Sequence, residues 1–164
     1  MTSPVIAVFP GTFDPITRGH EDMVQRAAQL FDRVIIAVAA GHHKKTMFSL
    51  PERISMVQLA LQACPNVQVE SFDGLIRDFV RAHAAKVMLR GVRSTTDFEY
   101  ERQLEGMNKS LMPEVETVFL TPCSQFQFVS STLVREIATL GGDVDQFVSA
   151  GVNQRLRHRV SEQK

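Results

Sequence analysis

The sequence predicts an α/β protein with a five-stranded parallel sheet and helices on both faces, in a doubly wound, Rossmann-like arrangement. Five short apolar runs, mostly of β-branched residues, recur along the 164 residues, and helix-like stretches separate them. Runs of this kind are typical of strands buried on both faces. Their alternation with helices implies parallel strands joined by right-handed crossovers. We expect one domain, 1–164, because the length suits one core and no linker or repeat interrupts the pattern.

The expected strands and helices follow one another in regular order. The strand-like runs are Val5–Phe9, Val34–Ala39, Val67–Ser71, Val87–Leu89 and Val115–Leu120. The helix-like stretches between them cover about 19–31, 50–62, 73–84 and 95–111. A capping box begins the second helix, because Glu52 follows Ser49 by three residues. The tail after Ala138 is also predicted to be helical, and either to cover an edge of the sheet or to meet another subunit.

The composition excludes several classes of protein. Lysine plus arginine number 18, as do aspartate plus glutamate, so the formal net charge is zero. Such a chain lacks the broad positive field of non-specific nucleic-acid binders, and we expect no nucleic-acid partner. The longest apolar run, Val34–Ala40, is far shorter than the ~20 residues that a membrane helix needs. Since residues 1–4 show no signal peptide, we expect a cytoplasmic protein with no membrane partner.

The segments that follow the five strands concentrate basic, hydroxyl and glycine residues. They are Pro10 to His20, Gly41 to Lys45, Asp73 to Ile76, Arg90 to Arg93, and Pro122 with Phe126 to Thr132. In doubly wound folds the ligand lies outside the carboxyl ends of the strands. The convergence of these segments at one edge of the sheet therefore predicts a polyphosphate site.

The first of these segments has the features of an anion-binding loop. Gly11 is expected to let the backbone turn sharply and approach a ligand closely. Thr12 offers a hydroxyl and an amide at the strand end. Gly19 and His20 open a helix whose N-terminal amides favour an anion, and His20 can donate to a phosphate oxygen. For the Thr-x-Gly-His pattern alone, a solvated residue at a helix start is an equally good interpretation of His20.

Two pairs of cations follow the second and fourth strands. Lys44 and Lys45 could be a solvated surface pair, but their loop faces the same edge as the first segment, which favours a phosphate contact for one of them. Arg90 and Arg93 could anchor phosphates bidentately. The alternative is that the two arginines form surface ion pairs with the acids of the next helix.

Ser130, Ser131 and Thr132 are predicted to begin a helix, with Ser130 as its N-cap. Their amides and hydroxyls could hold phosphates, or the cap could be an ordinary one without a ligand. The sequence shows no Cys–His or Ser–His–Asp pattern for covalent catalysis. Cys64 and Cys123 lack zinc or CxxC spacing, so we expect buried, reduced thiols and no protein metal site.

Several strings of residues resemble known motifs. Phe9 to His20 is similar to the signature of the nucleotidylyltransferase superfamily with its (H/T)xGH motif, and Ser130 to Arg135 resembles the superfamily's ISSTxxR motif. Arg90 to Arg93 with the acidic stretch 97–101, and residues 108–113, resemble the phosphopantetheine adenylyltransferase family. The resemblance covers nearly the whole chain. It departs mildly at Phe9 and Val129, and at Phe126, where the family often has tryptophan or tyrosine.

The resemblance implies an activity and a set of partners. The expected reaction transfers AMP from ATP to 4′-phosphopantetheine and gives dephospho-CoA and pyrophosphate. Magnesium ions (Mg²⁺) are expected to be held mainly by the ATP phosphates, with no protein metal site. The family also implies a homohexamer that coenzyme A inhibits.

The resemblance also implies a role for individual residues. His20 is the expected stabiliser of the transition state, with Lys44 and Arg90 as further catalytic residues. The phosphopantetheine side is implied to be Thr12, Lys44, Ile76 and Arg90. The ATP side is implied to be Thr12, Phe13, His20, Gly91, Val92, Arg93, Glu101, Phe126, Gln127, Phe128, Val129, Ser130, Ser131 and Thr132.

Three alternatives stay open at this point. Another small-molecule nucleotidylyltransferase, such as one acting on nicotinate mononucleotide, would share both superfamily motifs. A class I aminoacyl-tRNA synthetase would too, but 164 residues leave no room for a tRNA-binding domain. A non-catalytic module would bind ATP without releasing pyrophosphate.

An apolar stripe marks the helix predicted at 95–111. Tyr100, Leu104, Met107 and Leu111 recur at helical spacing. The stripe could pack on the protein's own sheet, or it could form a contact between subunits. Neighbouring Phe98 and Met112 add more apolar surface than one sheet contact needs, which favours the second interpretation.

Overall fold

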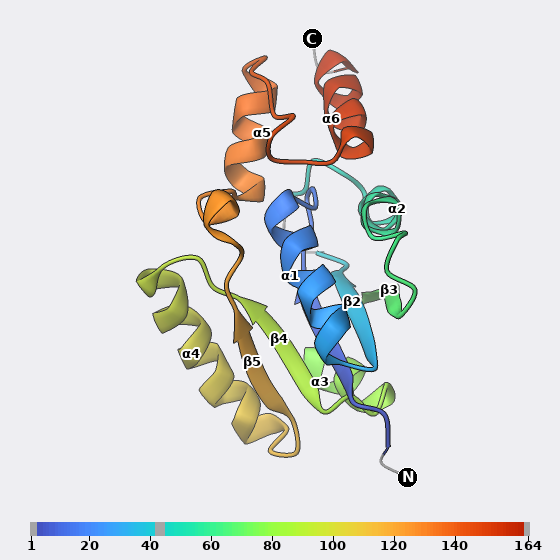
Figure 1. Cartoon of the computed structure of the whole chain (residues 1–164), viewed down its shortest axis with the longest axis vertical. Coiled ribbons are helices and arrows are strands. Elements are labelled where there is room, and N and C mark those ends of the chain that lie inside the picture. The colour runs from blue at the N-terminus through green and yellow to red at the C-terminus, as the bar shows by residue number, and fades with distance from the viewer. Residues whose placement is uncertain (1–2, 42–44, 163–164) are drawn as a thin grey trace.

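The computed structural model describes residues 3–41 and 45–162 and contains one parallel five-stranded sheet (Figure 1). The strands are β1 (Ile6–Gly11), β2 (Arg33–Ala39), β3 (Val67–Phe72), β4 (Val87–Gly91) and β5 (Glu116–Leu120). The helices are α1 (Arg18–Leu30), α2 (Leu50–Ala60), α3 (Ile76–Ala82), α4 (Thr95–Leu111), the 3₁₀ turn η1 (Ser124–Phe126), α5 (Ser131–Thr139) and α6 (Ala150–Glu162). The predicted α/β fold class is confirmed.

Helices cover both faces of the sheet, as the doubly wound interpretation requires. Side chains alternate along each strand, so Ala7 and Phe9 of β1 enter one apolar cluster, while Ile6 and Val8 enter the other. The first cluster includes the inner faces of α1 and α2. The second includes Val80 of α3 and the residues that follow α4. The buried apolar runs of the sequence are therefore strands packed on two sides.

The sheet has a topological switch point between β1 and β4. The strand order is β3-β2-β1-β4-β5, so the chain moves outward from β1 in one direction and returns to build the other half. β1 and β4 pair only at Ala7 with Val87 and at Val8 with Met88, although both strands run on for three more residues. The two strands separate at their carboxyl ends, which is where such folds place a ligand.

The local signals for strand and helix ends were mostly correct. Ser49 caps α2 with the predicted capping box, and Ser130 caps α5. β1 and β4 each run two residues further than predicted, so Gly11 and Gly91 belong to the strands. The helix predicted from 73 begins only at Ile76. Gly74 has a left-handed φ of 79°, which a helix cannot contain, so the helix starts after it.

The C-terminal tail is helical, as predicted, but it does not lie along an edge of the sheet. Instead α6 packs against α2 and α5, beyond the carboxyl ends of the strands (Figure 1). Val152 and Leu156 join the first apolar cluster. Arg159 donates to the carbonyl oxygen of Met47 at 2.7 Å and pairs with Glu52. The helix therefore braces the segment that connects β2 with α2.

Several structural features bear on the class of protein. No helix within residues 3–41 and 45–162 is long and apolar enough to cross a membrane. Over the same residues, no group of three or more His, Cys, Asp and Glu side chains is placed to hold a metal ion. Cys64 and Cys123 are free thiols, but each is half-buried rather than fully buried as predicted.

Candidate active site

A cavity of about 590 Å³ lies where β1 and β4 separate. Its walls come from the loop after β1, the start of α1, the end of β4, the first turns of α4 and the N-terminus of α5. Segments that are far apart in the sequence meet here because all the strands end at the same edge. A cavity therefore lies at the edge of the sheet where the sequence predicts the site.

Most of the predicted site residues line this cavity. They are Thr12, Phe13, His20, Arg90, Gly91, Arg93, Glu101, Val129, Ser130, Ser131 and Thr132. Lys44 lies outside the described residues, whereas Lys45 lines the cavity. The predicted residues that do not line it are Ile76, Val92, Phe126, Gln127 and Phe128.

Three of these outlying residues are held elsewhere by packing. Ile76 begins α3 and packs into the second apolar cluster. Val92 is buried, and its backbone amide, just after β4, donates to the carbonyl oxygen of Leu120 in β5. Phe126 packs against the first cluster, close to Gly19. Their proposed ligand contacts, and those of the exposed Gln127 and Phe128, stay predictions.

The loop after β1 turns at a different residue from the one predicted. Gly11 is the last residue of β1, and the left-handed backbone lies at Phe13, whose φ is 51°. A Cβ atom on Gly11 would lie 2.9 Å from the Phe13 ring. The prediction of a sharp turn at Gly11 was therefore wrong. The glycine makes room for the Phe13 side chain.

His20 is the third residue of α1 and is locked into one tautomer. The backbone amide of Thr17, the N-cap, donates to His20 Nδ1 at 3.1 Å. Nδ1 must accept this bond, so in the neutral ring the proton is on Nε2. Burial, helped by the charge of Arg93, lowers the pKa of His20 to about 4. At neutral pH the imidazole is therefore uncharged, with Nε2–H as its donor.

The two arginines after β4 have different partners. Arg90 forms a two-point ion pair with Glu101 of α4, with Nε–Oε2 at 2.5 Å and Nη2–Oε1 at 2.8 Å. Arg93 pairs with Asp97 at 3.7 Å and donates to the carbonyl oxygen of Val129 at 3.0 Å. The interpretation as a surface ion pair with Asp97 or Glu99 holds for Arg93, whereas Arg90 pairs with the largely buried Glu101. All of these charged groups line the cavity. A phosphate at Arg90 would compete with the Glu101 carboxylate.

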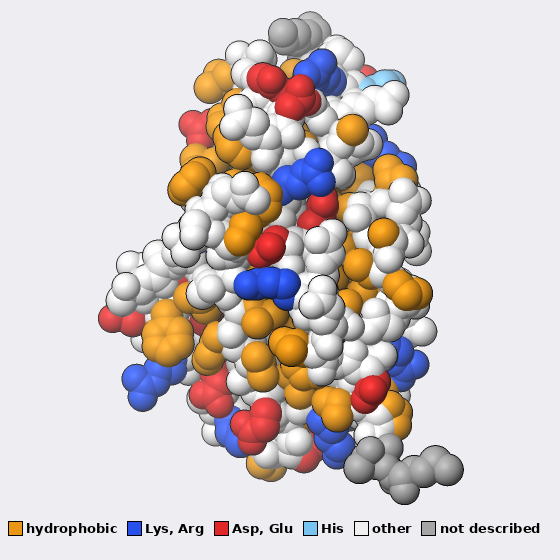
Figure 2. All heavy atoms as spheres, viewed as in Figure 1, with side chains coloured by type: hydrophobic (Ala, Val, Ile, Leu, Met, Phe, Trp, Pro, Cys, Tyr) orange, Lys and Arg blue, Asp and Glu red, His pale blue; other side chains and the backbone are white. Residues whose placement is uncertain are grey.

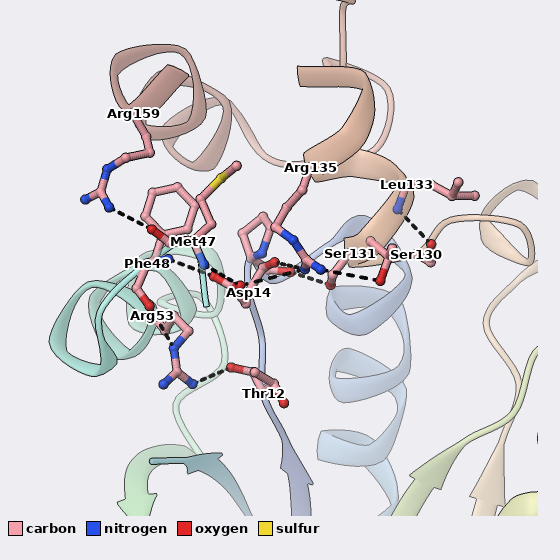
Figure 3. Close-up of polar contacts among 12 residues, drawn as sticks. Thr12, Asp14, Met47, Phe48, Arg53, Ser130, Ser131, Leu133, Arg135 and Arg159 are labelled. Carbon is pink, nitrogen blue, oxygen red and sulfur yellow. Dashed lines mark hydrogen bonds and ion pairs between the residues drawn. The ribbon is translucent and has the colours of Figure 1, made fainter. Parts of the chain in front are cut away.

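The first turn of α5 lines the same cavity with Ser130, Ser131 and Thr132. Ser130 accepts from the amide of Leu133 at 3.1 Å, as its N-cap role requires. The Ser131 hydroxyl donates to the carbonyl oxygen of Pro15 at 2.7 Å, which ties this helix start to the loop after β1 (Figure 3). The amides of a helix N-terminus, together with the hydroxyls of 130–132, suit phosphate oxygens.

The sequence is similar to that of a known family along nearly its whole length. Residues 8–137 match the cytidylyltransferase-like family. A phosphopantetheine adenylyltransferase of Acidovorax sp. (strain JS42) is 67% identical over 95% of this chain and 94% of its own length. Relatives with the same name from Janthinobacterium sp. (strain Marseille) and Bordetella pertussis are 56% and 52% identical over 97% and 98% of this chain, and over 99% and 95% of their own lengths. The chain belongs to the phosphopantetheine adenylyltransferase family.

Solved structures support the fold of this family member. A structure from Vibrio parahaemolyticus, described as a proposed nicotinate-nucleotide adenylyltransferase, superposes with a TM-score of 0.74 over 99% of this chain and 98% of that one, at 16% identity. A bifunctional NMN adenylyltransferase/ADP ribose pyrophosphatase from Francisella tularensis gives 0.73 over 97% of this chain and 50% of that one, at 18% identity. At such low identity these likenesses establish the fold alone.

Three charged residues that the sequence interpretation missed organise the site of this phosphopantetheine adenylyltransferase family member (Figure 3). The Asp14 carboxylate accepts from the amides of Met47 and Phe48 at 2.8 and 3.0 Å. Arg135 of α5 donates to the Asp14 carbonyl oxygen at 2.6 Å. Arg53 of α2 is fully buried and donates to the carbonyl oxygen of Thr12 at 2.7 Å.

Arg53 joins the ends of two strands to α2. Besides Thr12, its guanidinium donates to the carbonyl oxygens of Ala39, Ala40 and Phe48 at 2.8, 3.1 and 3.2 Å. The sequence carried a signal for this role. Arg53 lies one turn before Met56 and Val57, on the helix face that would otherwise be wholly apolar.

Proposed function

We propose that this protein is an adenylyltransferase that moves AMP from ATP to 4′-phosphopantetheine and gives dephospho-CoA and pyrophosphate. The observation that carries the proposal is the convergence, in one cavity, of the neutral His20, the Arg93 guanidinium and the N-terminus of α5. Such a set of donors suits a polyphosphate. The shared name of relatives up to 67% identical supplies the acceptor.

The reaction needs no covalent enzyme nucleophile. An oxygen of the 4′-phosphate forms a bond to the α-phosphorus of ATP, and the bond from that phosphorus to the β-phosphate oxygen breaks. A phosphate monoester has a second pKa of about 6, so the attacking group is already anionic at neutral pH. The protein's task is to align the two substrates and to stabilise charge on the phosphoryl oxygens.

His20 is assigned the transition-state contact. Its Nε2–H would donate to an α-phosphate oxygen as negative charge grows there. A neutral imidazole suits this role because it keeps its proton, and the fixed tautomer aims that proton away from Thr17 and toward the cavity. The histidine therefore acts as a hydrogen-bond donor and not as an acid or a base.

The remaining predicted residues divide between the two substrates. Thr12, Lys44 and Arg90 would hold the attacking phosphate, and Ile76 would contact the pantetheine arm. Arg93 and the start of α5 would hold the departing pyrophosphate. The residues proposed for the rest of ATP are Phe13, Gly91, Val92, Glu101, Phe126, Gln127, Phe128, Val129, Ser130, Ser131 and Thr132.

Mg²⁺ is proposed to arrive with ATP as part of the substrate. Two cavity carboxylates already have partners, because Asp14 accepts two backbone amides and Glu101 pairs with Arg90. These oxygens do not form a cation cage, so the ligands proposed for the ion are phosphate and water oxygens. In this role the ion would neutralise phosphate charge.

The proposed assembly is a homohexamer in the cytoplasm. Three residues of the predicted stripe on α4 face outward in the single chain, since Tyr100, Met107 and Leu111 are 64%, 68% and 44% exposed. Leu104 is half-buried, and the expectation that Met112 adds to this surface was wrong, because Met112 is buried in the second apolar cluster. Apolar side chains reach the surface near α4, whereas charges of both signs are scattered over this face of the molecule (Figure 2). An apolar face of this kind supports self-association, and the mixed charge supports the absence of a nucleic-acid partner.

The test is pyrophosphate release with ATP and 4′-phosphopantetheine, with each omitted in turn. We expect release only with both substrates, and dephospho-CoA in equal amount. Nicotinate mononucleotide is the competing acceptor to include, and pyrophosphate release with it in preference would overturn the assignment. Binding of ATP without any pyrophosphate release would show a non-catalytic module.

A further inference from the structure

Phe13 has an unusual backbone for its residue type. Among the residues that the structure describes, Phe13 and Ala84 are the two non-glycine residues with a left-handed φ. A bulky side chain is strained in that region, and such strain persists only where the surroundings impose it. Phe13 is also almost fully buried, with 3% of its surface exposed. The strained backbone places its ring at a definite point in the site.

The Phe13 ring lies against the imidazole of His20. The two ring centroids are 5.1 Å apart and the planes meet at 66°, which is a favourable edge-to-face contact. On another side the ring packs against Phe9, at 5.9 Å and 85°. The ring also occupies the space of a Cβ atom at position 11, which would lie 2.9 and 3.0 Å from two of its carbons.

The imidazole needs a second contact to hold its orientation. The χ2 torsion of histidine is broad and roughly two-fold, so rotation about it is easy in the absence of packing. The amide and the hydroxyl of Thr17 both lie 3.1 Å from Nδ1, but contacts to this one ring atom still allow the rest of the ring to rock. We propose that Phe13 is a positioning residue whose ring clamps the His20 imidazole with Nε2–H toward the cavity, and that residue 11 is glycine to admit that ring.

The sequence of the loop follows from this arrangement. Within one short stretch of chain, each residue supports the next. Gly11 leaves room for the Phe13 ring, this ring packs on the His20 imidazole, and the Thr17 amide donates to the same imidazole. The contact also buries one side of the imidazole, in keeping with the lowered pKa of His20. The inference rests on the proposed transfer reaction for its kinetic readout only, because the orientation of the ring can be measured without substrates.

The first experiment compares Phe13→Leu with Phe48→Leu by NMR of the histidine ring nitrogens in the full-length, ligand-free protein. Phe48 is equally buried, belongs to the same apolar cluster and packs against Arg159 instead of His20. The His20 signals are assigned with His20→Asn. We expect the Nε2–H tautomer in the wild type and in Phe48→Leu, and a tautomer mixture or exchange broadening in Phe13→Leu. An unchanged His20 spectrum in Phe13→Leu would overturn the proposal.

Steady-state kinetics give the matching readout for turnover. A donor misplaced by up to ~1 Å can cost 10²-fold, so we expect Phe13→Leu to lower kcat by about 10-fold. KM for phosphopantetheine should change less than about twofold, and KM for ATP, to whose site Phe13 is also assigned, should change less than kcat does. Phe48→Leu should keep its kcat, and melting temperatures report the stability of both. If the enzyme proves inactive toward phosphopantetheine, the NMR comparison still decides the role of Phe13.

A double-mutant cycle tests the reason for Gly11. Gly11→Ala would push the Phe13 ring and should lower kcat and disturb the His20 tautomer as Phe13→Leu does. With the smaller leucine at 13 the added methyl has room, so the kcat loss from Gly11→Ala should shrink by at least about half in that background. An equal loss in both backgrounds would show that Gly11 serves close approach of the ligand instead, and would overturn this part of the proposal.

Discussion

Two substitutions at His20 separate the catalytic contact from the structural one. Asparagine places its amide oxygen near the position of Nδ1, so His20→Asn can still accept the Thr17 amide but has no donor at Nε2. Glutamine reaches to the position of Nε2 with a donor but cannot accept that amide as well. Losing one hydrogen bond to a charged oxygen in the transition state costs about 10²–10³-fold in kcat, or about 2.7–4 kcal/mol. We expect that loss for His20→Asn, and a smaller loss in kcat for His20→Gln.

Stability should follow the opposite order. His20→Gln gives up a capping interaction that is worth about 1 kcal/mol, whereas His20→Asn retains it. The assay is steady-state pyrophosphate release together with thermal unfolding of each variant. His158→Asn is the control, because His158 lies on α6 with 73% of its side chain exposed. A wild-type kcat in His20→Asn would refute the assigned role. A lower melting temperature for His20→Asn than for His20→Gln would refute the assigned tautomer.

The lowered pKa of His20 predicts that the unfolding free energy depends on pH, and the same variants test this. Because burial lowers the pKa of His20 from 6.5 to about 4, the unfolded chain takes up a proton in this range that the folded chain does not. Folding stability contributed by the neutral ring is complete above pH 6.5 and is lost as the pH falls toward 4, by roughly 3 kcal/mol at most. His20→Asn lacks this contribution, so its unfolding free energy should fall less than that of the wild type between pH 6.5 and 4. Equal slopes would show that His20 titrates normally in the folded state.

Three further predictions concern other parts of the molecule. Lys44→Ala should lower kcat/KM far more than Lys45→Ala in steady-state assays, and equal or reversed losses would show that the other ammonium holds the phosphate. Burial raises the pKa of Glu21, so its negative charge at pH 7 destabilises the folded state. Glu21→Gln should therefore raise the melting temperature slightly at pH 7, and this gain should disappear as the pH falls. A lower melting temperature of Glu21→Gln at pH 7 would contradict this. Sedimentation equilibrium at micromolar concentration should show a hexamer that Tyr100→Glu or Met107→Glu dissociates, and a single 18.4 kDa wild-type species would refute the assembly.

The parts of the fold that the sequence could predict depend on local signals. The five strands are buried on both faces, so their apolar runs stand out against the helices between them. Helix starts were found where a side chain caps a nearby amide, as at Ser49 and Ser130. The start of α3 was missed because no side chain caps it. The packing of α6 was missed because its partners, α2 and α5, are chosen by the tertiary fold.

The location of the cavity was predictable for a topological reason. All five strands are parallel, so all strand ends meet at one edge and their polar residues gather there. The partners within that edge were not predictable. The sequence offered Asp97 or Glu99 as the alternative partner of Arg90, yet its guanidinium pairs with Glu101, a cavity residue further along α4. Such a choice depends on the angle at which α4 leaves β4, which no local pattern encodes.

The site therefore has a local half and a distant half, and the two respond differently to change. Gly11, Phe13, Thr17 and His20 position one another within one short segment, so the donor geometry at His20 should survive changes elsewhere in the chain. The distant half depends on buried polar ties such as Arg53, which links the carbonyl oxygens at the ends of β1 and β2 to α2. Loss of one such tie leaves several carbonyl oxygens without this donor at once. Substitutions in the local half should therefore act mainly on kcat, whereas loss of a distant tie should act on stability and on the placement of the substrate phosphate together.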